Sequence, residues 1–265
     1  MSLLNKENDI IEDLVLVEIK KRRLKEIRGK YEFENEASLD SDVFEQYCAN
    51  LSKVDAFCQP NIQGLPLFYK MRKDVKVVFS AKRPHYGERY NDHSFSDVLI
   101  LGEYVASDPK FGECVILYVN NISECSRSKI SFETLMLAVY IHELYHVYFR
   151  SGDNYILDVE EPLAEFGALF SLEAMASMGV IAGSAVTEYL EFVSNKTKLP
   201  KYSFGSHIYS KHQDYPSWIM GVLLDHYRIK VQNSDLMDLS HIYTENLDKW
   251  DEAYEELCKA LNYVD

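Results

Sequence analysis

The sequence lacks the features that mark secreted, membrane-bound and disulfide-rich proteins. Its cysteines are odd in number and have no repeating spacing, so they indicate neither a disulfide framework nor a cysteine-type zinc site. No apolar run near the N-terminus is long enough for a signal peptide or a membrane span, because charged residues interrupt residues 6–13. These absences predict reduced thiols and a cytoplasmic location. The cysteines are Cys48, Cys58, Cys114, Cys125 and Cys258.

The chain also has few positive charges for its size. Its 28 lysines and arginines stand against 42 acidic residues, which gives a formal net charge of −14 at pH 7. Nucleic-acid backbones and anionic membrane surfaces would repel such a chain. The composition therefore predicts no nucleic-acid partner and no membrane binding, and a cationic or neutral partner fits better. With 47% hydrophobic and 13% aromatic residues, the chain is expected to fold rather than to be disordered.

One stretch, Val139–Tyr148, contains an H-E-x-x-H motif. On a helix, His142 and His146 lie four residues apart, so both imidazoles project from one face and can bind a single ion. Glu143 is close enough to contact a water on that ion without being a ligand itself. The flanks are almost wholly apolar, and burying these polar groups without partners is costly. The motif therefore predicts a metal site, with a core helix whose polar groups bond to one another as the alternative.

Residues 139–148 resemble the zincin pattern of zinc metallopeptidases, in which the positions around the two histidines are uncharged and the last is apolar. Residues 161–165 are similar to the third-ligand helix of the gluzincin branch, where a small residue and a second acidic residue follow a glutamate ligand. They are also similar to the corresponding segment of ImmA/IrrE-type metallopeptidases, which usually have Asn where this chain has Glu165. The resemblance covers residues 113–178 and implies a zincin fold and a glutamate as third ligand.

Two imidazoles and one carboxylate with an open fourth position form the ligand set of a catalytic zinc. A bound Zn²⁺ lowers the pKa of its water toward ~7 and polarises the carbonyl of a substrate. Glu143 could take the proton of the attacking water and pass it to the leaving amine. The sequence therefore predicts a zinc-dependent metallopeptidase that acts on a peptide or protein substrate. Two alternatives remain: a regulatory or interaction protein that keeps the zinc site with little or no hydrolysis, and an accidental motif that binds no metal.

Several glutamates compete for the position of third ligand, namely Glu160, Glu161, Glu165 and Glu173. Glu173 lies ~18 Å from Glu161 along a helix and cannot share its site, whereas Glu160 is rotated by ~100° and should face away. Glu161 and Glu165 lie on one face, and the longer gap from His146 to Glu165 is the commoner one among some gluzincin aminopeptidases. If Glu161 is the ligand, however, Glu165 can hold the second ring nitrogen of a ligand histidine. We therefore expect Glu161 as the ligand and Glu165 as the outer partner, with Glu165 as ligand as the alternative.

A hydrogen-bond donor for the oxyanion is expected later in the chain. The best stretch is residues 202–209, taken as a loop, in which His207, Tyr202 and Tyr209 could each donate. Of these we favour His207. The remaining histidines have no partner at ligand spacing, so they are expected to be packing or surface residues. They are His85, His93, His212, His226 and His241.

The periodicity of the apolar residues predicts an α+β protein. Strands over residues 76–80, 97–104 and 114–120 should form a small mixed sheet that packs against the motif helix. The run Glu113–Asn120 fits the edge strand that lines a zincin cleft, which could bind a substrate backbone. It fits a central strand equally well, because its apolar run is continuous rather than alternating.

Helices are expected before and after this sheet. The motif helix should begin near Ser131, which can cap it, and should end near Gly152. The next helix should end at Gly179, a residue suited to the left-handed conformation. The expected helices span residues 9–28, 42–57, 131–152, 158–178, 185–195, 216–229, 235–246 and 250–262.

The chain is expected to form a single compact domain over residues 1–265, because no shift in composition divides it. A helical part over residues 1–72 should precede the sheet and the metal-site helices over residues 73–180. A second helical part should follow over residues 181–265.

Overall fold

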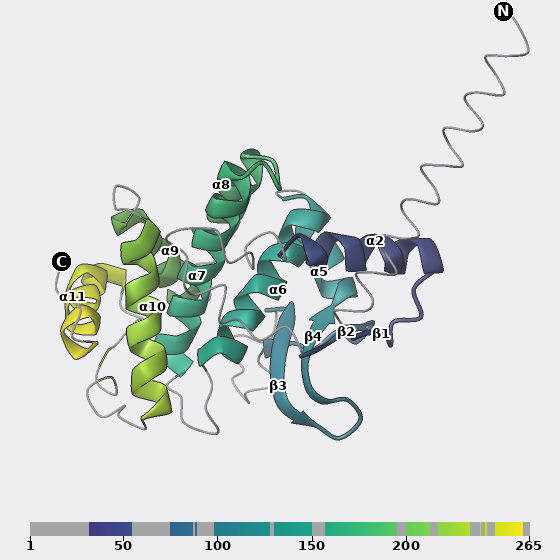
Figure 1. Ribbon diagram of the computed structural model, residues 1–265, viewed down its shortest axis with the longest axis horizontal. Coiled ribbons are helices and arrows are strands. Elements are labelled where there is room, and N and C mark those ends of the chain that lie inside the picture. Colours follow the sequence, from purple (N-terminus) through teal and green to yellow (C-terminus); the bar gives the residue numbers. More distant parts are fainter. Residues whose placement is uncertain are drawn as a thin grey trace, which may run out of the picture.

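The chain is a mixed α+β protein in which a small sheet is followed by a group of helices (Figure 1). The expected α+β class is therefore confirmed. The expected helix over residues 9–28, most of the one over 235–246, and His93 and His241 lie outside the described residues. The computed structural model describes residues 32–54, 75–86, 88, 98–127, 130–149, 157–194, 200–212, 217–233, 239, 242 and 247–261.

Within the described residues the sheet has four strands, in the order β1-β2-β4-β3. Strands β1 (Phe33–Asn35), β2 (Lys76–Ser80) and β4 (Gly112–Tyr118) run parallel to one another. Strand β3 (Gly102–Asp108) pairs antiparallel with β4 and forms one edge of the sheet. The sheet is therefore mixed, as expected. The central position of β4 contradicts the expectation that this run is the edge strand and agrees with the alternative of a central strand.

The strand boundaries differ from the expected ones where neighbouring residues find other partners. Strand β2 has the expected bounds, but β3 begins at Gly102, and Leu99 before it forms an isolated antiparallel bridge with His85. Strand β4 ends at Tyr118, because Val119 begins a short helix, α5 (Val119–Ser126). Neither α5 nor the three-residue strand β1 was expected from the sequence, since both are too short to show a clear period.

Helices α2 (Ser41–Leu51) and α6 (Phe132–Phe149) cover one face of the sheet (Figure 1). The Asp40 side chain caps α2 by accepting a hydrogen bond from the Asp42 backbone N–H at 3.0 Å. Phe79 of β2 contacts aromatic side chains of α2, which ties this helix to the sheet. Helix α2 and the turn after it agree with the expected helix over residues 42–57 as far as Val54, the last described residue of this stretch.

Helix α6 carries the H-E-x-x-H motif and is the centre of the core. Its residues 135–149 are all buried, which explains why the helix is apolar on every side rather than amphipathic. Ser131 Oγ accepts a hydrogen bond from the Thr134 backbone N–H at 3.1 Å, so the expected cap is confirmed. The helix ends at Phe149, and Gly152 lies outside the described residues.

Helix α7 (Leu157–Ser177) packs against α6 and ends at the expected glycine. Gly179 has a positive φ of 70°, which favours glycine. The Val180 N–H donates to Met175 O at 2.9 Å, and the Gly179 N–H donates to Ala176 O at 3.0 Å. These two bonds form a Schellman motif, so the expected stop of this helix is confirmed.

The described residues beyond α7 are mainly helical, as expected (Figure 1). Three helices overlap expected ones, but α9 falls where a loop was expected. Serine residues and Gly205 hide the helical period there, although Pro200 is well suited to the first position of a helix. The helices are α8 (Ser184–Ser194), α9 (Pro200–Lys211), α10 (Ser217–Gln232) and α11 (Trp250–Ala260), the last preceded by the 3-10 helix η4 (Leu247–Lys249).

None of the helices in the described part of the chain has the length and apolar character that a membrane crossing requires. The cytoplasmic location stays a prediction.

Helix α9 approaches α7 closely at Gly205. A Cβ atom at this position would lie 2.5 Å from Pro162 O and 2.6 Å from Glu165 Cβ. Because these are backbone and near-backbone atoms, they cannot move aside without separating the two helices. Gly205 therefore sets the distance between α9 and the segment of α7 that carries the acidic residues of the motif region.

Replacing this glycine should separate the helices and destabilise the protein. We expect Gly205→Ala to lower the free energy of unfolding by about 1–3 kcal/mol, the usual cost of overpacking, despite the higher helix propensity of alanine. Urea unfolding followed by circular dichroism measures the change. Gly183→Ala is the matched control, because no atom lies within 4 Å of a Cβ there. Equal stability of the two variants would contradict the tight contact.

Candidate metal centre

Two helices bring three potential metal ligands together in the core. His142 and His146 project from the same face of α6, and their Nε2 atoms lie 3.1 Å apart. Glu161 of α7 faces them, with Oε2 at 3.1 Å from His142 Nε2 and 3.7 Å from His146 Nε2. All three residues are buried. The structure thus groups the residues that the sequence analysis expected to share one ion.

The separations among these atoms suit a single metal ion. In a tetrahedral zinc site with bonds of about 2.0–2.2 Å, neighbouring ligand atoms are about 3.3–3.6 Å apart. The three observed separations, 3.1, 3.1 and 3.7 Å, bracket that range. The group could therefore hold a metal ion. Glu161 as the third ligand stays a prediction, which these distances support.

Glu160 also belongs to the site, contrary to the expectation that it faces away. Its Oε1 accepts a hydrogen bond from His146 Nδ1 at 2.6 Å, and its Oε2 accepts one from Tyr227 Oη at 3.2 Å. The expectation is wrong because the two nitrogens of one imidazole ring point in different directions. Glu160 and Glu161, although rotated from each other on α7, therefore contact opposite edges of His146. A carboxylate on the outer nitrogen fixes the orientation of a ligand histidine.

Glu165 lies on the side of His142 that carries the second ring nitrogen. Its Oε2 is 3.4 Å from His142 Nδ1. This contact is longer than an aligned hydrogen bond, and neither His142 Nδ1 nor Glu165 Oε1 has a hydrogen-bond partner among the described residues. The carboxylate of Glu165 is thus near the outer ring nitrogen rather than in the ligand group. Its role as outer partner stays a prediction.

The imidazoles and carboxylates of the site shift one another's pKa values. Burial lowers the pKa of His142, but the hydrogen bond with Glu161 and the nearby Glu165 carboxylate outweigh burial and raise this pKa to about 9. The pKa of His146 is also raised, because Glu161 and Glu160 together outweigh burial. For Glu161, burial raises the pKa, and the two histidines overcome it and hold the pKa well below its usual value. In the absence of metal, protonation of the imidazoles therefore supplies positive charge beside the buried carboxylates.

Glu143 faces a different neighbour, the first residue of β3. A Cβ atom at Gly102 would lie 3.0 Å from Glu143 Oε1 and 2.5 Å from Val139 Cγ1, so only glycine lets this strand approach α6 so closely. Burial raises the pKa of Glu143, and the positive charges of His146 and His142 offset part of the rise. Glu143 is not a member of the ligand group. A buried carboxylate with a raised pKa is suited to accept a proton.

His207 does not reach the metal centre, which contradicts its expected position as oxyanion donor. Its Nε2 lies 3.0 Å from Asp251 Oδ1 of α11, and its ring packs against Trp250. Because residues 202–209 are helical, His207 and Tyr202 face different neighbours. The Tyr202 ring stacks on His142, with the ring centroids 5.7 Å apart. Of the three donors considered from the sequence, Tyr202 therefore contacts a potential metal ligand.

Two further residues near the site had no signal in the sequence. Tyr189 of α8 is buried, and its pKa is raised well above the usual value by burial and by the adjacent Glu165 carboxylate. Lys201 of α9 is buried beside Tyr202. Both arrive from helices far along the chain. The other described histidines, His85, His212 and His226, are not in the ligand group, as expected.

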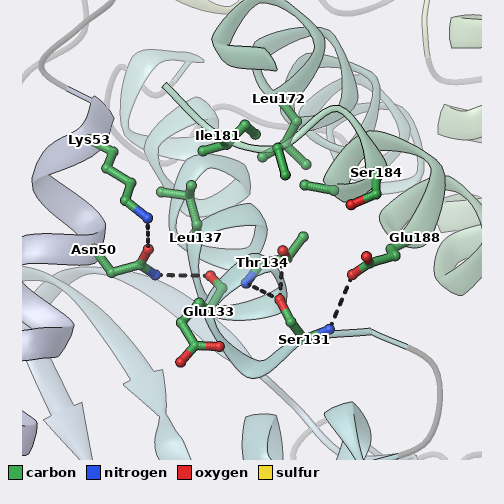
Figure 2. A pocket seen from close by; sticks show the side chains of 12 residues that line it. Asn50, Lys53, Ser131, Glu133, Thr134, Leu137, Leu172, Ile181, Ser184 and Glu188 are labelled. Carbon is green, nitrogen blue, oxygen red and sulfur yellow. Dashed lines mark hydrogen bonds between the residues drawn. The ribbon is translucent and has the colours of Figure 1, made fainter. Parts of the chain in front are cut away.

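A separate pocket of about 310 Å³ lies at the other end of α6 (Figure 2). Leu137 and Leu172 line it together with the capping residue Ser131, whose N–H donates to Glu188 Oε2 at 3.3 Å. None of the three potential metal ligands lines this pocket. It is therefore distinct from the metal centre.

The geometry ranks the glutamates by their effect on metal binding. Glu161→Ala should lose zinc, because it removes one of three ligands, whereas Glu160→Ala and Glu165→Ala should weaken binding by about 10–100-fold. Competition with a chromophoric chelator measures the affinities. Glu173→Ala is the control on the same helix, since Glu173 instead accepts a hydrogen bond from Tyr209 Oη. Loss of zinc in Glu165→Ala but not in Glu161→Ala would reverse the assignment.

Protons should compete with the metal. In metal-free protein His142 has a pKa of about 9, so at pH 7 this ring is protonated and must lose its proton when zinc binds. We expect proton release at pH 7 and an affinity that increases with pH until the pH exceeds this pKa. Calorimetry in two buffers with different ionisation enthalpies measures the number of protons released. Zinc binding without proton release would contradict this account.

Comparisons of the chain with protein-family models, curated proteins and solved structures found no match. The interpretation of the site therefore depends on its own geometry.

Proposed function

We propose that this protein is a zinc-dependent metallopeptidase with a zincin-like fold. The observation that carries the proposal is the buried group of His142, His146 and Glu161, whose donor atoms lie at the separations of ligands of one ion. Two imidazole nitrogens and one carboxylate oxygen suit a zinc ion that keeps an open position. A bound zinc would supply an activated water and would polarise the carbonyl of a peptide bond.

In this proposal Glu143 is the general base. It takes the proton of the attacking water and passes it to the leaving amine. Burial favours the first of these steps, because a carboxylate with a raised pKa binds a proton more readily than an exposed one. The outer carboxylates of Glu160 and Glu165 would hold the histidine rings in orientation.

Strand β3 is our candidate for the edge that binds the substrate backbone. It runs antiparallel to β4, and Gly102 at its start lies against Glu143. No strand pairs with the other edge of β3 in the described part of the chain. An extended peptide could therefore add to this edge beside the general base. This arrangement is what the zincin resemblance implies, with β3 in place of the run first considered.

The deep burial of the site favours one rival function, a regulatory or interaction protein with a zinc site and little or no hydrolysis. The exposed fractions of His142, His146 and Glu161 are only 5%, 4% and 8%. A closed zinc site contributes to folding rather than to catalysis. The fourth coordination position separates the two functions: water there supports an enzyme, and a protein ligand supports the rival.

Glu143→Gln tests the peptidase directly. We expect hydrolysis of a peptide library to fall below detection while about one zinc per chain remains bound, because the variant loses the base but no ligand. Mass spectrometry of the digest and metal analysis measure the two properties. Glu133→Gln is the matched control, since Glu133 lies in the first turn of the same helix and lines the separate pocket.

Retained turnover in Glu143→Gln would remove Glu143 as the base. Absence of turnover in the wild-type protein, with zinc bound, would support the regulatory function. Absence of zinc in the wild-type protein, purified without chelators, would contradict both.

A further inference from the structure

Lys201 is a buried cation with no carboxylate of the described residues paired with it. Only 4% of this residue is exposed, although it lies in the first turn of α9. Its Nζ donates a hydrogen bond to the phenol oxygen of Tyr86 at 2.7 Å and lies 5.0 Å from the centroid of that ring. No described carboxylate lies within ion-pair distance of Lys201. Its partner is thus a neutral side chain.

This arrangement is costly for folding alone. Lysine is almost never fully buried without an anionic partner, because moving an ammonium out of water is unfavourable. The chain has 42 acidic residues, so a shortage of carboxylates does not explain why none of the described ones pairs with Lys201. An ammonium has three N–H donors, and the described contacts use one of them, which goes to Tyr86. The contacts among the described residues thus leave two donors and one positive charge for a ligand.

Lys201 is linked to the metal centre through Tyr202, the next residue of α9. Tyr202 stacks on the His142 ring. Close packing at Gly205 against Glu165 fixes α9 next to the same site. The first turn of α9 therefore forms one wall of the metal centre.

Tyr86 is linked to the metal centre through the segment that precedes β3. The Tyr86 N–H donates to Val98 O at 2.7 Å, and the Ile100 N–H donates to Pro84 O at 3.1 Å. Two residues later, Gly102 packs against Glu143. The contact between Lys201 and Tyr86 thus joins the wall formed by α9 to the wall that carries the proposed substrate edge.

We propose that Lys201 binds a carboxylate of the substrate, with Tyr86 as a positioning residue that holds the ammonium in place. This proposal rests on the proposed peptidase function, because it assigns the class of substrate at the same site. The carboxylate could be the α-carboxylate at the C-terminus of a peptide or the side chain of an acidic residue. One ammonium with two available N–H groups matches one carboxylate, whereas phosphate sites usually combine several cationic or backbone donors.

Binding to an inactive, zinc-loaded protein tests the proposal without requiring turnover. The full chain with Glu143→Gln would be titrated with fluorescein-labelled random pentapeptides, prepared either as C-terminal acids or as C-terminal amides. Two mixtures lack Asp and Glu and differ only in the C-terminal group, which is an acid in one and an amide in the other. Two amidated mixtures differ only in a fixed central residue, which is Glu in one and Gln in the other. Fluorescence anisotropy measures the affinities. We expect a carboxylate to tighten binding by about 10- to 100-fold, the range for a hydrogen bond to a charged group.

The two sources of the carboxylate give different results. A preference for acids over amides in the mixtures without Asp and Glu assigns the α-carboxylate and an exopeptidase specificity. A preference for Glu over Gln in the amidated mixtures assigns an acidic side chain. Either result supports the proposal.

Variants at Lys201 separate recognition from a structural role. Lys201→Met keeps the apolar stem and removes the charge, so the ratio of affinities for carboxylate and neutral peptides should approach one, while Lys201→Arg should retain part of the preference. Lys211→Met is the control, because Lys211 of the same helix is exposed and pairs with Asp251. Should Lys201→Met fail to fold by circular dichroism, Tyr86→Phe, which keeps the ring, should lower the preference several-fold.

Two outcomes overturn the proposal. One is the absence of any carboxylate preference in the parent protein, whether or not peptides bind. The other is a carboxylate preference that stays intact in Lys201→Met, including the case in which charged and neutral peptides both bind more weakly by the same factor. If Lys201→Met does not fold, the same result in Tyr86→Phe overturns the proposal. Wild-type turnover is measured separately, so a preference without hydrolysis would refute the peptidase and leave the carboxylate site standing. Hydrolysis without a preference would support the peptidase and refute the carboxylate site.

Discussion

The burial of ionisable side chains between α6 and α7 is the constraint on which the rest of the structure depends. His142 and His146 of α6 meet Glu160, Glu161 and Glu165 of α7 inside a core that is mainly apolar. Each of these groups would be destabilising by itself. Together they pair imidazoles with carboxylates, and the pKa values of the histidines rise accordingly. A cation bound by His142, His146 and Glu161 would replace the protons, so the same pairing that stabilises the metal-free core also prepares a metal site.

Two glycines let the backbone of two different elements come close to this charged core. Gly102 allows β3 to lie against Val139 and Glu143, and Gly205 allows α9 to lie against Pro162 and Glu165. Side chains at either position would force the elements apart. The close approach of α9 also explains why Tyr202 stacks on His142 and why Lys201 is buried nearby. The surroundings of the metal centre are therefore set by backbone contacts as much as by the ligands.

Several expectations failed for a common physical reason. Glu160 was expected to face away because a helical wheel gives only the direction of each side chain. It does not show that one imidazole ring can contact two side chains that point in different directions. His207 was expected at the site because the sequence shows no helical period over residues 202–209, whereas these residues lie in helix α9. The run Glu113–Asn120 was considered as an edge strand, although its continuous apolar character also fits the central position that β4 occupies. In each case the missing information was the packing of one element on another.

What the sequence by itself determined is local. The spacing of His142 and His146 places both rings on one face of a helix, and Ser131 and Gly179 mark helix ends, because hydrogen bonds within a few residues decide these features. The partners of those rings were decided only by the tertiary structure. Which edge of His146 meets Glu160, and which helix brings Lys201 toward Tyr86, depends on contacts between residues far apart in the chain. No period or motif records such contacts, since they arise from the packing of whole elements around the buried charges.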